Sequence, residues 1–373
     1  MMDVFAAADN IISPLGVTTR SNVEQVLKGA SGISRQPGGW FGAVMPPGTV
    51  EPLADAAQLH AYTRFEQLLI LSVKDALSRT HISLQNERTA FIVSTTKGNI
   101  ALLEEGDVPT LRLHNTAEKV AAYFGAKSKP LVVSNACISG LLAILIGQRL
   151  IRSGKFDHAV VCGADLFTPF VLSGFQSFQA VSDEPCRPFD AARKGVTLGE
   201  GAGTVVLTSQ TTSLAGTVAR LGEGASCNDA NHISGPSRTG EELAGAIRRA
   251  VAGSGLQPEN IGFVSAHGTA TLYNDEMEAK AFHLAGLQQT PVNSLKGYYG
   301  HTLGAAGLIE AIVGMHCMFE GIVPATAGFQ QPGTSLPLAV SGQPQQRPME
   351  HYLKTTSGFG GCNAAMVFSK INL

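Results

Sequence analysis

Cys137 is the residue whose place in the sequence most favours covalent chemistry. It lies in Val-Val-Ser-Asn-Ala-Cys-Ile-Ser-Gly, between a predicted strand at 131–134 and a predicted apolar helix at 138–152. Unpaired N–H groups at a helix N-terminus carry partial positive charge, which lowers the pKa of a thiol. A sharp strand-to-helix turn also presents a side chain at the sheet edge, as in the nucleophile elbow of hydrolases. Most free cysteines are simply buried, but this context makes Cys137 the candidate nucleophile.

Two histidines and one lysine follow other predicted strands. His267 follows a strand predicted at 262–265, Lys296 follows one at 292–294, and His301 precedes a long helix predicted at 303–319. A lone histidine is more often structural than catalytic. Two histidines in matching strand-to-loop positions, together with a cysteine at a helix start, indicate one shared site. The glycines after His301 lack the Lys-Ser/Thr ending of a phosphate-binding loop, so we interpret them as allowing close helix packing.

The segment Ser357-Gly-Phe-Gly-Gly-Cys-Asn363 holds three glycines in a short span. Such a tight backbone path exposes N–H groups that could bind a developing oxyanion. A plain hairpin turn is the alternative interpretation.

The elements that must position these residues alternate between strands and helices. Further strands are predicted at 3–8, 89–94, 159–163, 203–208, 216–221 and 364–369, and further helices at 22–28, 65–79, 241–252 and 275–285. Continuous apolar strands without polar alternation are typical of sheets covered on both faces, as in layered α/β folds. The similar order in the two parts predicts a pseudo-duplicated fold with halves at 1–210 and 211–373. Long surface loops are expected at 34–48 and 330–348, which are rich in Pro, Gly and Gln.

The composition excludes several classes of protein. The 373 residues carry 27 Lys+Arg and 29 Asp+Glu, a net charge of −2, and 44% are hydrophobic. The high hydrophobic fraction favours a large buried core. The near-neutral net charge lacks the excess of positive charge that is typical of nucleic-acid-binding proteins. The six cysteines form no CxxC pair or zinc-finger spacing, so we expect a reduced cytoplasmic protein without a structural metal. The N-terminus lacks a signal-peptide pattern, and three polar residues interrupt the apolar stretch 305–325, which argues against a membrane span.

These motifs together resemble the β-ketoacyl-acyl carrier protein synthases. The resemblance rests on Asn-Ala-Cys137-Ile-Ser-Gly, His267-Gly-Thr-Ala-Thr with Asn274, Asp275 and Glu278, Lys296 with Gly300-His301 and Gly-Ala-Ala-Gly, and Gly358-Phe359-Gly-Gly. It is supported by Ser13-Pro-Leu-Gly and Arg187-Pro-Phe-Asp, and it runs from about residue 3 to residue 368 in the family's order. The Cys-His-His set is similar to synthases I and II rather than to synthase III, in which an Asn replaces the second His.

The resemblance implies a fold, a reaction and partners. The fold would be a thiolase-like five-layered αβαβα sandwich, normally dimeric. The reaction would be a decarboxylative Claisen condensation, in which a Cys-bound acyl group is extended by malonyl-acyl carrier protein. No cofactor is implied, because the substrates are carried on the phosphopantetheine of the carrier protein. A homodimer is expected, and a heterodimer with another ketosynthase-like subunit remains open.

The resemblance also implies roles for individual residues. Cys137 would take the acyl chain, His267 and His301 would stabilise the enolate, and Lys296, paired with Glu310, would orient the site. The other roles fall on the oxyanion-binding N–H groups of Cys137 and Phe359, the acyl gate Phe359, the pantetheine-binding Thr269 and Thr271, the supporting Asp275 and Glu278, the pocket residues Lys97 and Phe189, and the carrier-docking Arg64, Arg193 and Lys194.

The sequence departs from the family pattern in four places. The connection 98–131 is short, Lys97 replaces an apolar or small pocket residue, Ser357 replaces a Phe, and Val196-Thr197 replaces an aromatic pair. A buried lysine without a partner costs several kcal/mol. Lys97 must therefore reach water, pair with an acid or meet a polar substrate. These changes leave a specialised polyketide pathway, with an aryl or polyene chain, open beside fatty-acid elongation.

Two other functions remain open. A chain-length-determining partner subunit would have this fold, but such subunits usually lack the cysteine. A cysteine hydrolase or thioesterase would use a Cys–His pair, but that function leaves the second histidine and Lys296 unexplained.

Overall fold

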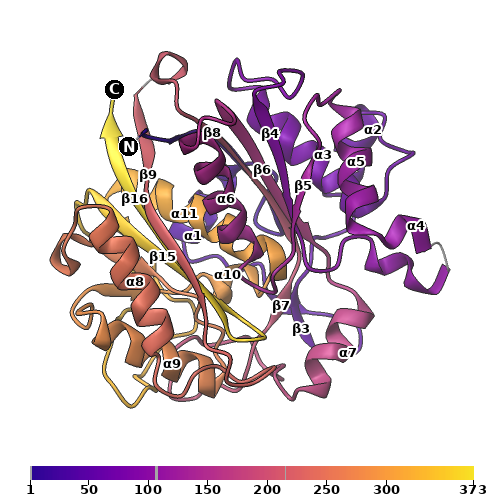
Figure 1. Cartoon of the computed structure of the whole chain (residues 1–373). Helices are drawn as coiled ribbons and strands as arrows, with labels where there is room; N and C mark the ends of the chain where they lie inside the picture. The colour runs from indigo at the N-terminus through magenta and orange to yellow at the C-terminus, as the bar shows by residue number, and fades with distance from the viewer. Residues whose placement is uncertain (1, 106–107, 215) are drawn as a thin grey trace.

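The computed structural model describes residues 2–105, 108–214 and 216–373, and one large twisted sheet runs through it (Figure 1). One side of the sheet has the strand order β1 (Phe5–Ile12), β8 (Gly201–Thr208), β6 (His158–Asp165), β4 (Thr89–Ser94) and β5 (Leu131–Val133). The other side has the order β9 (Thr217–Asn228), β16 (Cys362–Asn372), β15 (His351–Gly358), β10 (Phe263–Ser265), β11 (Pro291–Asn293) and β13 (Ala339–Val340). The two sides join through a short antiparallel pairing of β1 with β9.

Two buried helices lie between the two sides of the sheet. The helices α6 (Ser139–Arg152) and α11 (Ala306–Glu320) contact each other and strands from both sides. Their apolar side chains form the central core, which also takes residues from both groups of strands. The segment Leu303–Glu320 is apolar and long enough to cross a membrane, but it is 83% buried inside the protein. It is therefore the core helix of this layer.

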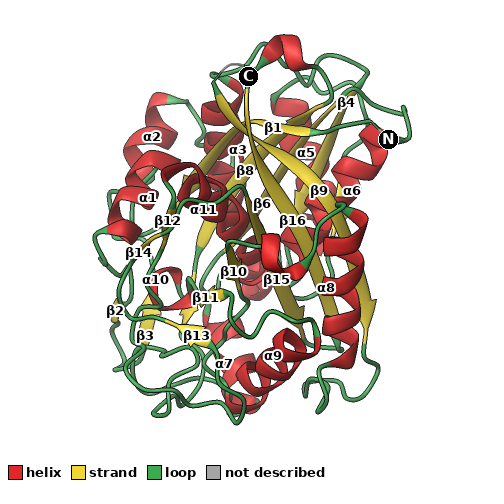
Figure 2. Cartoon of the chain, turned by 90° about the vertical axis from the view of Figure 1, so that its left-hand side faces the viewer, coloured by secondary structure: helices red, strands yellow, loops and turns green. Residues whose placement is uncertain are grey.

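Other helices cover the two outer faces (Figure 2). The helices α3 (Arg64–Leu77) and α5 (Leu113–Tyr123) pack on the N-terminal strands around a second apolar cluster. The helices α8 (Glu241–Gly253) and α9 (Leu272–Leu284) pack on the C-terminal strands around a third. The layers therefore follow the order helix, sheet, helix, sheet, helix, as predicted.

The two halves have the same internal order. In each, the first strand (β1 or β9) lies beside the last (β8 or β16), followed by the equivalents β6 or β15, β4 or β10, and β5 or β11. Each half also contributes one helix to the centre. The division predicted between residues 210 and 211 falls between β8 and β9. We propose that 1–210 and 211–373 are the two units of a duplicated fold.

Most predicted elements lie within a few residues of the observed ones. Among the observed helices and strands of eight residues or more, β15, α5 and α7 (Pro169–Ser177) have no counterpart in the sequence prediction, and neither do most of the shorter elements. The strand β15 has the sequence His-Tyr-Leu-Lys-Thr-Thr-Ser-Gly. It is almost wholly buried, but its polar residues do not give the apolar run by which a buried strand is recognised. The predicted helix 303–319 begins with a 3₁₀ turn at Leu303–Ala305. The remaining elements are α1 (Thr19–Leu27), β2 (Ser34–Arg35), β3 (Phe41–Ala43), α2 (Glu51–Ala56), η1 (Ile100–Glu105), α4 (Val108–Leu111), β7 (Leu198–Gly199), η2 (Thr211–Ser213), η3 (Pro258–Asn260), α10 (Lys296–Tyr299), β12 (Ile322–Val323) and β14 (Gln345–Gln346).

Candidate active site

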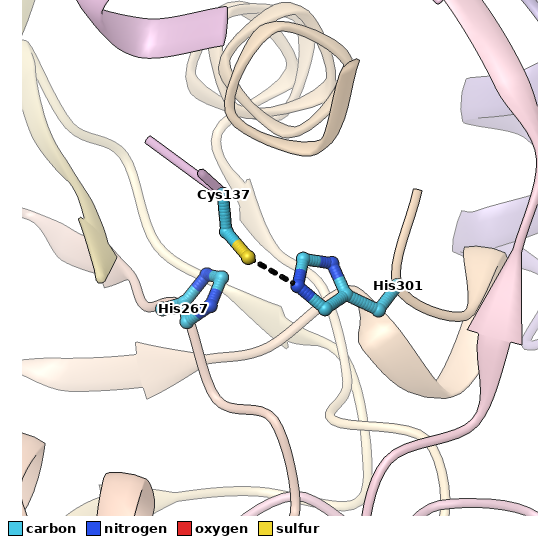
Figure 3. Close-up of side chains that lie close together, drawn as sticks. All are labelled: Cys137, His267 and His301. Atoms are coloured by element: carbon cyan, nitrogen blue, oxygen red, sulfur yellow. Dashed lines mark hydrogen bonds between the residues drawn. The ribbon is translucent and has the colours of Figure 1, made fainter. Parts of the chain in front are cut away.

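The turn between β5 and α6 places Cys137 beside both histidines (Figure 3). Ala136, just before it, has a φ of 44°, a left-handed conformation that non-glycine residues rarely adopt and that marks a sharp turn. The Sγ atom of Cys137 lies 2.9 Å from Nε2 of His301. One nitrogen of each ring and the sulfur all lie within 4.8 Å of one another. The structure thus brings together the three residues that the sequence analysis singled out.

The protonation of this group differs from the expectation for the thiol. Burial raises the pKa of Cys137 to about 12, opposite to the lowering expected from the helix N-terminus, because desolvation outweighs the nearby positive charges. Burial and the charge of Lys296 hold the pKa of both histidines well below its ordinary value. Both imidazoles are therefore neutral at pH 7, and the Cys137 thiol can donate its proton to Nε2 of His301.

Lys296 lies directly behind His267. Its Nζ atom is 3.0 Å from the carbonyl oxygen of His267 and 3.4 Å from Nδ1 of the same ring. The ammonium group also forms a buried ion pair with Glu310 of α11. Cys137 and the two histidines could offer three ligands to zinc, but this ammonium group beside the ring opposes a second cation there.

Two buried carboxylates hold the backbone of the loop that begins at His267. Glu278 accepts hydrogen bonds from the N–H groups of His267 at 2.8 Å and Gly268 at 2.7 Å. Asp275 accepts from the N–H groups of Phe189 at 2.7 Å and Ala270 at 3.2 Å. Burial raises the pKa of Asp275 to about 7 and also raises that of Glu278. Both carboxylates therefore support the loop without reaching the thiol.

A cavity of about 440 Å³ opens from these three residues. Thr269 and Thr271 line it, with their hydroxyl oxygens 2.9 Å apart. Phe359 lines it as well, with its ring centroid 5.5 Å from that of Phe175 and 5.3 Å from that of Phe178. An elongated substrate could pass the two threonines to reach Cys137. The rings of Phe359, Phe175 and Phe178 would then lie along the same cavity.

The glycine-rich segment is a hairpin turn that also lies against the nucleophile. Gly358 pairs with Cys362 at the end of the hairpin of β15 and β16. A Cβ atom on Gly358 would lie only 2.9 Å from the backbone nitrogen of Cys137. This closeness requires glycine, and it puts the backbone around Phe359 beside the N–H group of Cys137. The hairpin interpretation is confirmed, and oxyanion binding by the N–H groups of this segment stays a prediction.

The comparisons with known proteins agree with this arrangement. Residues 3–213 match the family described as "Beta-ketoacyl synthase, N-terminal domain", and residues 219–330 match "Beta-ketoacyl synthase, C-terminal domain". The chain belongs to the β-ketoacyl synthase family. It is a condensing enzyme of the acyltransferase class.

Its relatives include a 3-oxoacyl-[acyl-carrier-protein] synthase and a polyketide synthase subunit. The chain is 30% identical to "3-oxoacyl-[acyl-carrier-protein] synthase 2" of Vibrio cholerae, over 97% of both chains. It is 30% identical to the "Tetracenomycin polyketide synthase ketoacyl synthase alpha subunit" of Streptomyces glaucescens, over 84% of this chain and 82% of the relative. Among solved structures, a ketosynthase in complex with its chain length factor from Xenorhabdus doucetiae has a TM-score of 0.84 and 25% identity, over 99% of this chain and 98% of that one. A β-ketoacyl synthase from Burkholderia phymatum has a TM-score of 0.89 and 23% identity over the whole of both chains, which confirms the thiolase-like fold.

The predicted docking residues of this β-ketoacyl synthase occupy different environments. The exposure expected for Arg193 is wrong: it is 7% exposed, donates to the carbonyl oxygens of Asp190 and Gly333, and lies 3.8 Å from Asp275. Arg64 is partly buried and pairs with Glu51 and Glu200. Lys194 is half-exposed, lines the cavity and pairs with Glu184.

The two predicted pocket residues lie outside the lining of this cavity, as far as the described residues define it. Lys97 is partly exposed, in keeping with the expectation that it reaches water, and its backbone N–H group donates to Asp165. Phe189 is 1% exposed and packs below the loop of Gly268.

Two of the buried charged residues near the site, Asp165 and Lys354, have no counterpart in the sequence prediction. Asp165, at the end of β6, accepts hydrogen bonds from Thr95, Thr96 and the N–H group of Gly304, so it ties the loop after β4 to the segment that follows His301. The position of Asp165, a charged residue just after a predicted apolar strand, could have marked it as a functional candidate. Lys354 lies on β15, which the sequence did not predict as a strand, and no local pattern marks it.

Proposed function

We propose that the chain is a β-ketoacyl-acyl carrier protein synthase that joins an acyl group held on Cys137 to a malonyl thioester with loss of CO2. The observation that carries the proposal is the meeting of a thiol with two neutral imidazoles in the lining of one cavity. A thiol is the group that exchanges acyl chains with thioesters. Two neutral N–H donors suit an enolate oxygen.

Acyl transfer would begin with His301. Its Nε2 atom takes the thiol proton, and the Cys137 sulfur attacks the thioester carbonyl of an acyl carrier protein. The N–H groups of Cys137 and Phe359 would hold the resulting oxyanion. The tetrahedral intermediate collapses as the C–S bond to the pantetheine breaks, and the departing thiolate recovers the proton from His301. An acyl-Cys137 thioester remains.

Condensation would use both histidines. A malonyl thioester enters past Thr269 and Thr271, and its C–CO2 bond breaks so that the electron pair forms an enolate. Once Cys137 is acylated, Nε2 of His301 no longer faces a thiol, so the neutral ring can carry its proton there. The N–H groups of His267 and His301 would then donate to the enolate oxygen. Its carbon then attacks the acyl-Cys137 carbonyl, and the C–S bond to the enzyme breaks. The product is a β-ketoacyl thioester on the carrier, and the departing Cys137 thiolate takes a proton from solvent, which restores the thiol.

Release of CO2 from malonyl-acyl carrier protein tests the proposal. The acyl-loaded enzyme should release CO2 and form a β-ketoacyl product, and Cys137→Ala should form no product. Cys162→Ala, at a buried cysteine in the strand β6, is the matched control and should keep activity. An enzyme that is acylated but only hydrolyses the acyl group would instead be a thioesterase. A chain that neither accepts acyl groups nor condenses them would be the non-catalytic partner of another ketosynthase.

The partner is proposed to be an acidic acyl carrier protein, met in the cytoplasm. Of the three predicted docking residues, the half-exposed Lys194 in the cavity lining suits this role best. Arg64 is partly buried and already paired with Glu51, so it is less free to bind a partner. Lys194→Ala should raise the KM for carrier-bound substrate and weaken its salt dependence, because exposed charges are screened over about 8–10 Å. A small thioester substrate should be unaffected. Equal losses for both substrates would place the docking site elsewhere.

The assembly and pathway are proposed from the relatives. Their names include a 3-oxoacyl-[acyl-carrier-protein] synthase and the alpha subunit of a polyketide synthase, and one solved neighbour is a ketosynthase with its chain length factor. We therefore propose a homodimer, or a heterodimer with a second ketosynthase-like chain, that extends fatty-acid, polyketide or aryl polyene chains. Mass spectrometry of the acyl group trapped on Cys137 would identify the chain.

A further inference from the structure

Lys354 is a second fully buried lysine in the cluster behind His267. It lies at the middle of β15 and is 0% exposed, on the same face of the strand as Tyr352, whose hydroxyl group donates to the carbonyl oxygen of Ala311 in α11. Its side chain therefore points into the central layer. Burying an ammonium group is costly unless each of its protons finds an acceptor, so the position requires an explanation.

The contacts of Lys354 supply three acceptors. Its Nζ atom lies 2.7 Å from Oε2 of Glu310 and 3.1 Å from each of the carbonyl oxygens of Ser265 and Ala266. Burial lowers the pKa of Lys354, but Nζ donates to the two carbonyl groups and forms an ion pair with the Glu310 carboxylate, and these contacts favour the ammonium form. We conclude that Lys354 carries its charge.

The two lysines divide one carboxylate between them. Oε1 of Glu310 pairs with Lys296, and Oε2 pairs with Lys354. The three side chains therefore carry a net charge of +1, whereas Lys296 and Glu310 alone would be neutral. Since the surroundings are buried, this charge is weakly screened. It acts at the end of the cavity where an enolate would form.

The same lysines also hold the backbone that leads to His267. Lys354 binds the carbonyl oxygens of Ser265 and Ala266, and Lys296 binds that of His267. Three successive carbonyl groups at the end of β10 are thus held by two ammonium groups. On the opposite side, Glu278 holds the N–H groups of His267 and Gly268.

We propose that Lys354 is a positioning residue for decarboxylation: by sharing Glu310 with Lys296 and holding the end of β10, it keeps His267 in place and leaves positive charge behind it. The inference rests on the proposed function, and it adds a residue that no motif of the sequence marks. In the described part of the chain, the charged and titratable groups around His267 are Lys296 at the start of α10, His301 after it, Lys354 of β15, Glu278 of α9, Glu310 of α11 and Cys137 before α6.

Lys354→Met tests the proposal, because it removes the charge and keeps most of the length. Decarboxylation of malonyl-acyl carrier protein should fall about tenfold or more, the range found when groups that orient a functional side chain are lost. Acylation of Cys137 should change little, because its oxyanion would form at the N–H groups of Cys137 and Phe359. Loss of the positive charge should raise the pKa of His267, so the acidic limb of the decarboxylation profile should move to higher pH.

Two further variants separate charge from packing. Tyr352→Phe, on the same face of the same strand, loses a buried hydrogen bond without changing charge and should leave the pH profile unchanged. Lys354→Gln can still donate to a carbonyl group, so it should fold if Lys354→Met does not, and it should show the same loss. The proposal would be overturned if Lys354→Gln kept full decarboxylation activity. It would also be overturned if Lys354→Met folded and its decarboxylation had the same pH profile as the wild type.

An NMR titration of the histidine rings keeps this inference distinct from the proposed function. The His267 signal is assigned with His267→Gln, and its pKa is compared between wild type and Lys354→Met. If the wild-type enzyme releases no CO2 from the malonyl thioester, the proposed function fails, while an upward shift of the His267 pKa would still support the electrostatic role of Lys354. An unchanged His267 pKa would contradict that role.

Discussion

The pairing of Cys137 with His301 predicts that the two histidines differ in acyl loading. A pKa of about 12, against an ordinary value of 9.0, corresponds to roughly 4 kcal/mol of cost for the thiolate. At pH 7 only about one thiol in 10⁵ would be ionised without help. The Nε2 atom of His301 at 2.9 Å supplies that help as a base, whereas no hydrogen bond joins His267 to the sulfur in the part of the chain that the structure describes.

The perturbation is therefore His301→Ala, with His267→Ala as the matched control. Loss of a general base typically costs about 10²–10⁴ in rate. We expect alkylation of Cys137 by iodoacetamide at pH 7 to slow by about that factor in His301→Ala and to change little in His267→Ala. Decarboxylation of the malonyl thioester should fall in both variants, by roughly 10²–10³ for each lost donor.

The pH dependence of alkylation, followed by mass spectrometry of the Cys137 peptide, distinguishes the mechanisms. In the wild type the rate should be nearly flat around neutral pH, because the lowered pKa keeps His301 neutral there. In His301→Ala the rate should rise about tenfold per pH unit, since the free thiol must ionise by itself. A His301→Ala enzyme that is alkylated as fast as the wild type at pH 7, or whose rate levels off by pH 8, would refute the reasoning.

Three further predictions concern stability. Arg193→Met should destabilise the protein by about 3–5 kcal/mol, since it leaves Asp275 buried without its cation; urea unfolding measures this, and a loss below 1 kcal/mol would indicate that the hydrogen bonds of Asp275 suffice. Gly304→Ala should cost about 1–3 kcal/mol, because its Cβ would lie 2.8 Å from the backbone of Thr95; an unchanged melting temperature would show that the backbone yields. His316 and Asp9 form an ion pair. Burial disfavours the charged form of each residue, but the pairing outweighs it, so the pKa of His316 is raised and that of Asp9 is lowered. The pair therefore stabilises most below the unfolded-state pKa of His316 and above that of Asp9. Asp9→Asn should cost more stability at pH 6 than at pH 9, where His316 is uncharged, and equal losses at the two pH values would contradict the pairing.

Sequence patterns predict those parts of this protein that depend on local chemistry. The apolar strands and the helix of Cys137 are visible because continuous apolar runs must be covered on both faces. The nucleophile, the two histidines and the glycine-rich turn each occupy a recognisable strand end or helix start. Their order along the chain carries the resemblance to the ketosynthases, and with it the layered fold that the structure and comparisons confirm.

Other features were decided only by the tertiary structure, because they depend on what surrounds a side chain. Arg193 reads as a surface charge in its turn, yet it is buried against Asp275 from a distant helix. The helix N-terminus predicts a lowered thiol pKa for Cys137, but the packing of both halves desolvates the sulfur and raises it. Lys354 becomes intelligible only when β15 is placed beside β10 and α11, since its three acceptors come from those two elements. Burial and partners separated by tens of residues are set by packing, and no local pattern contains them.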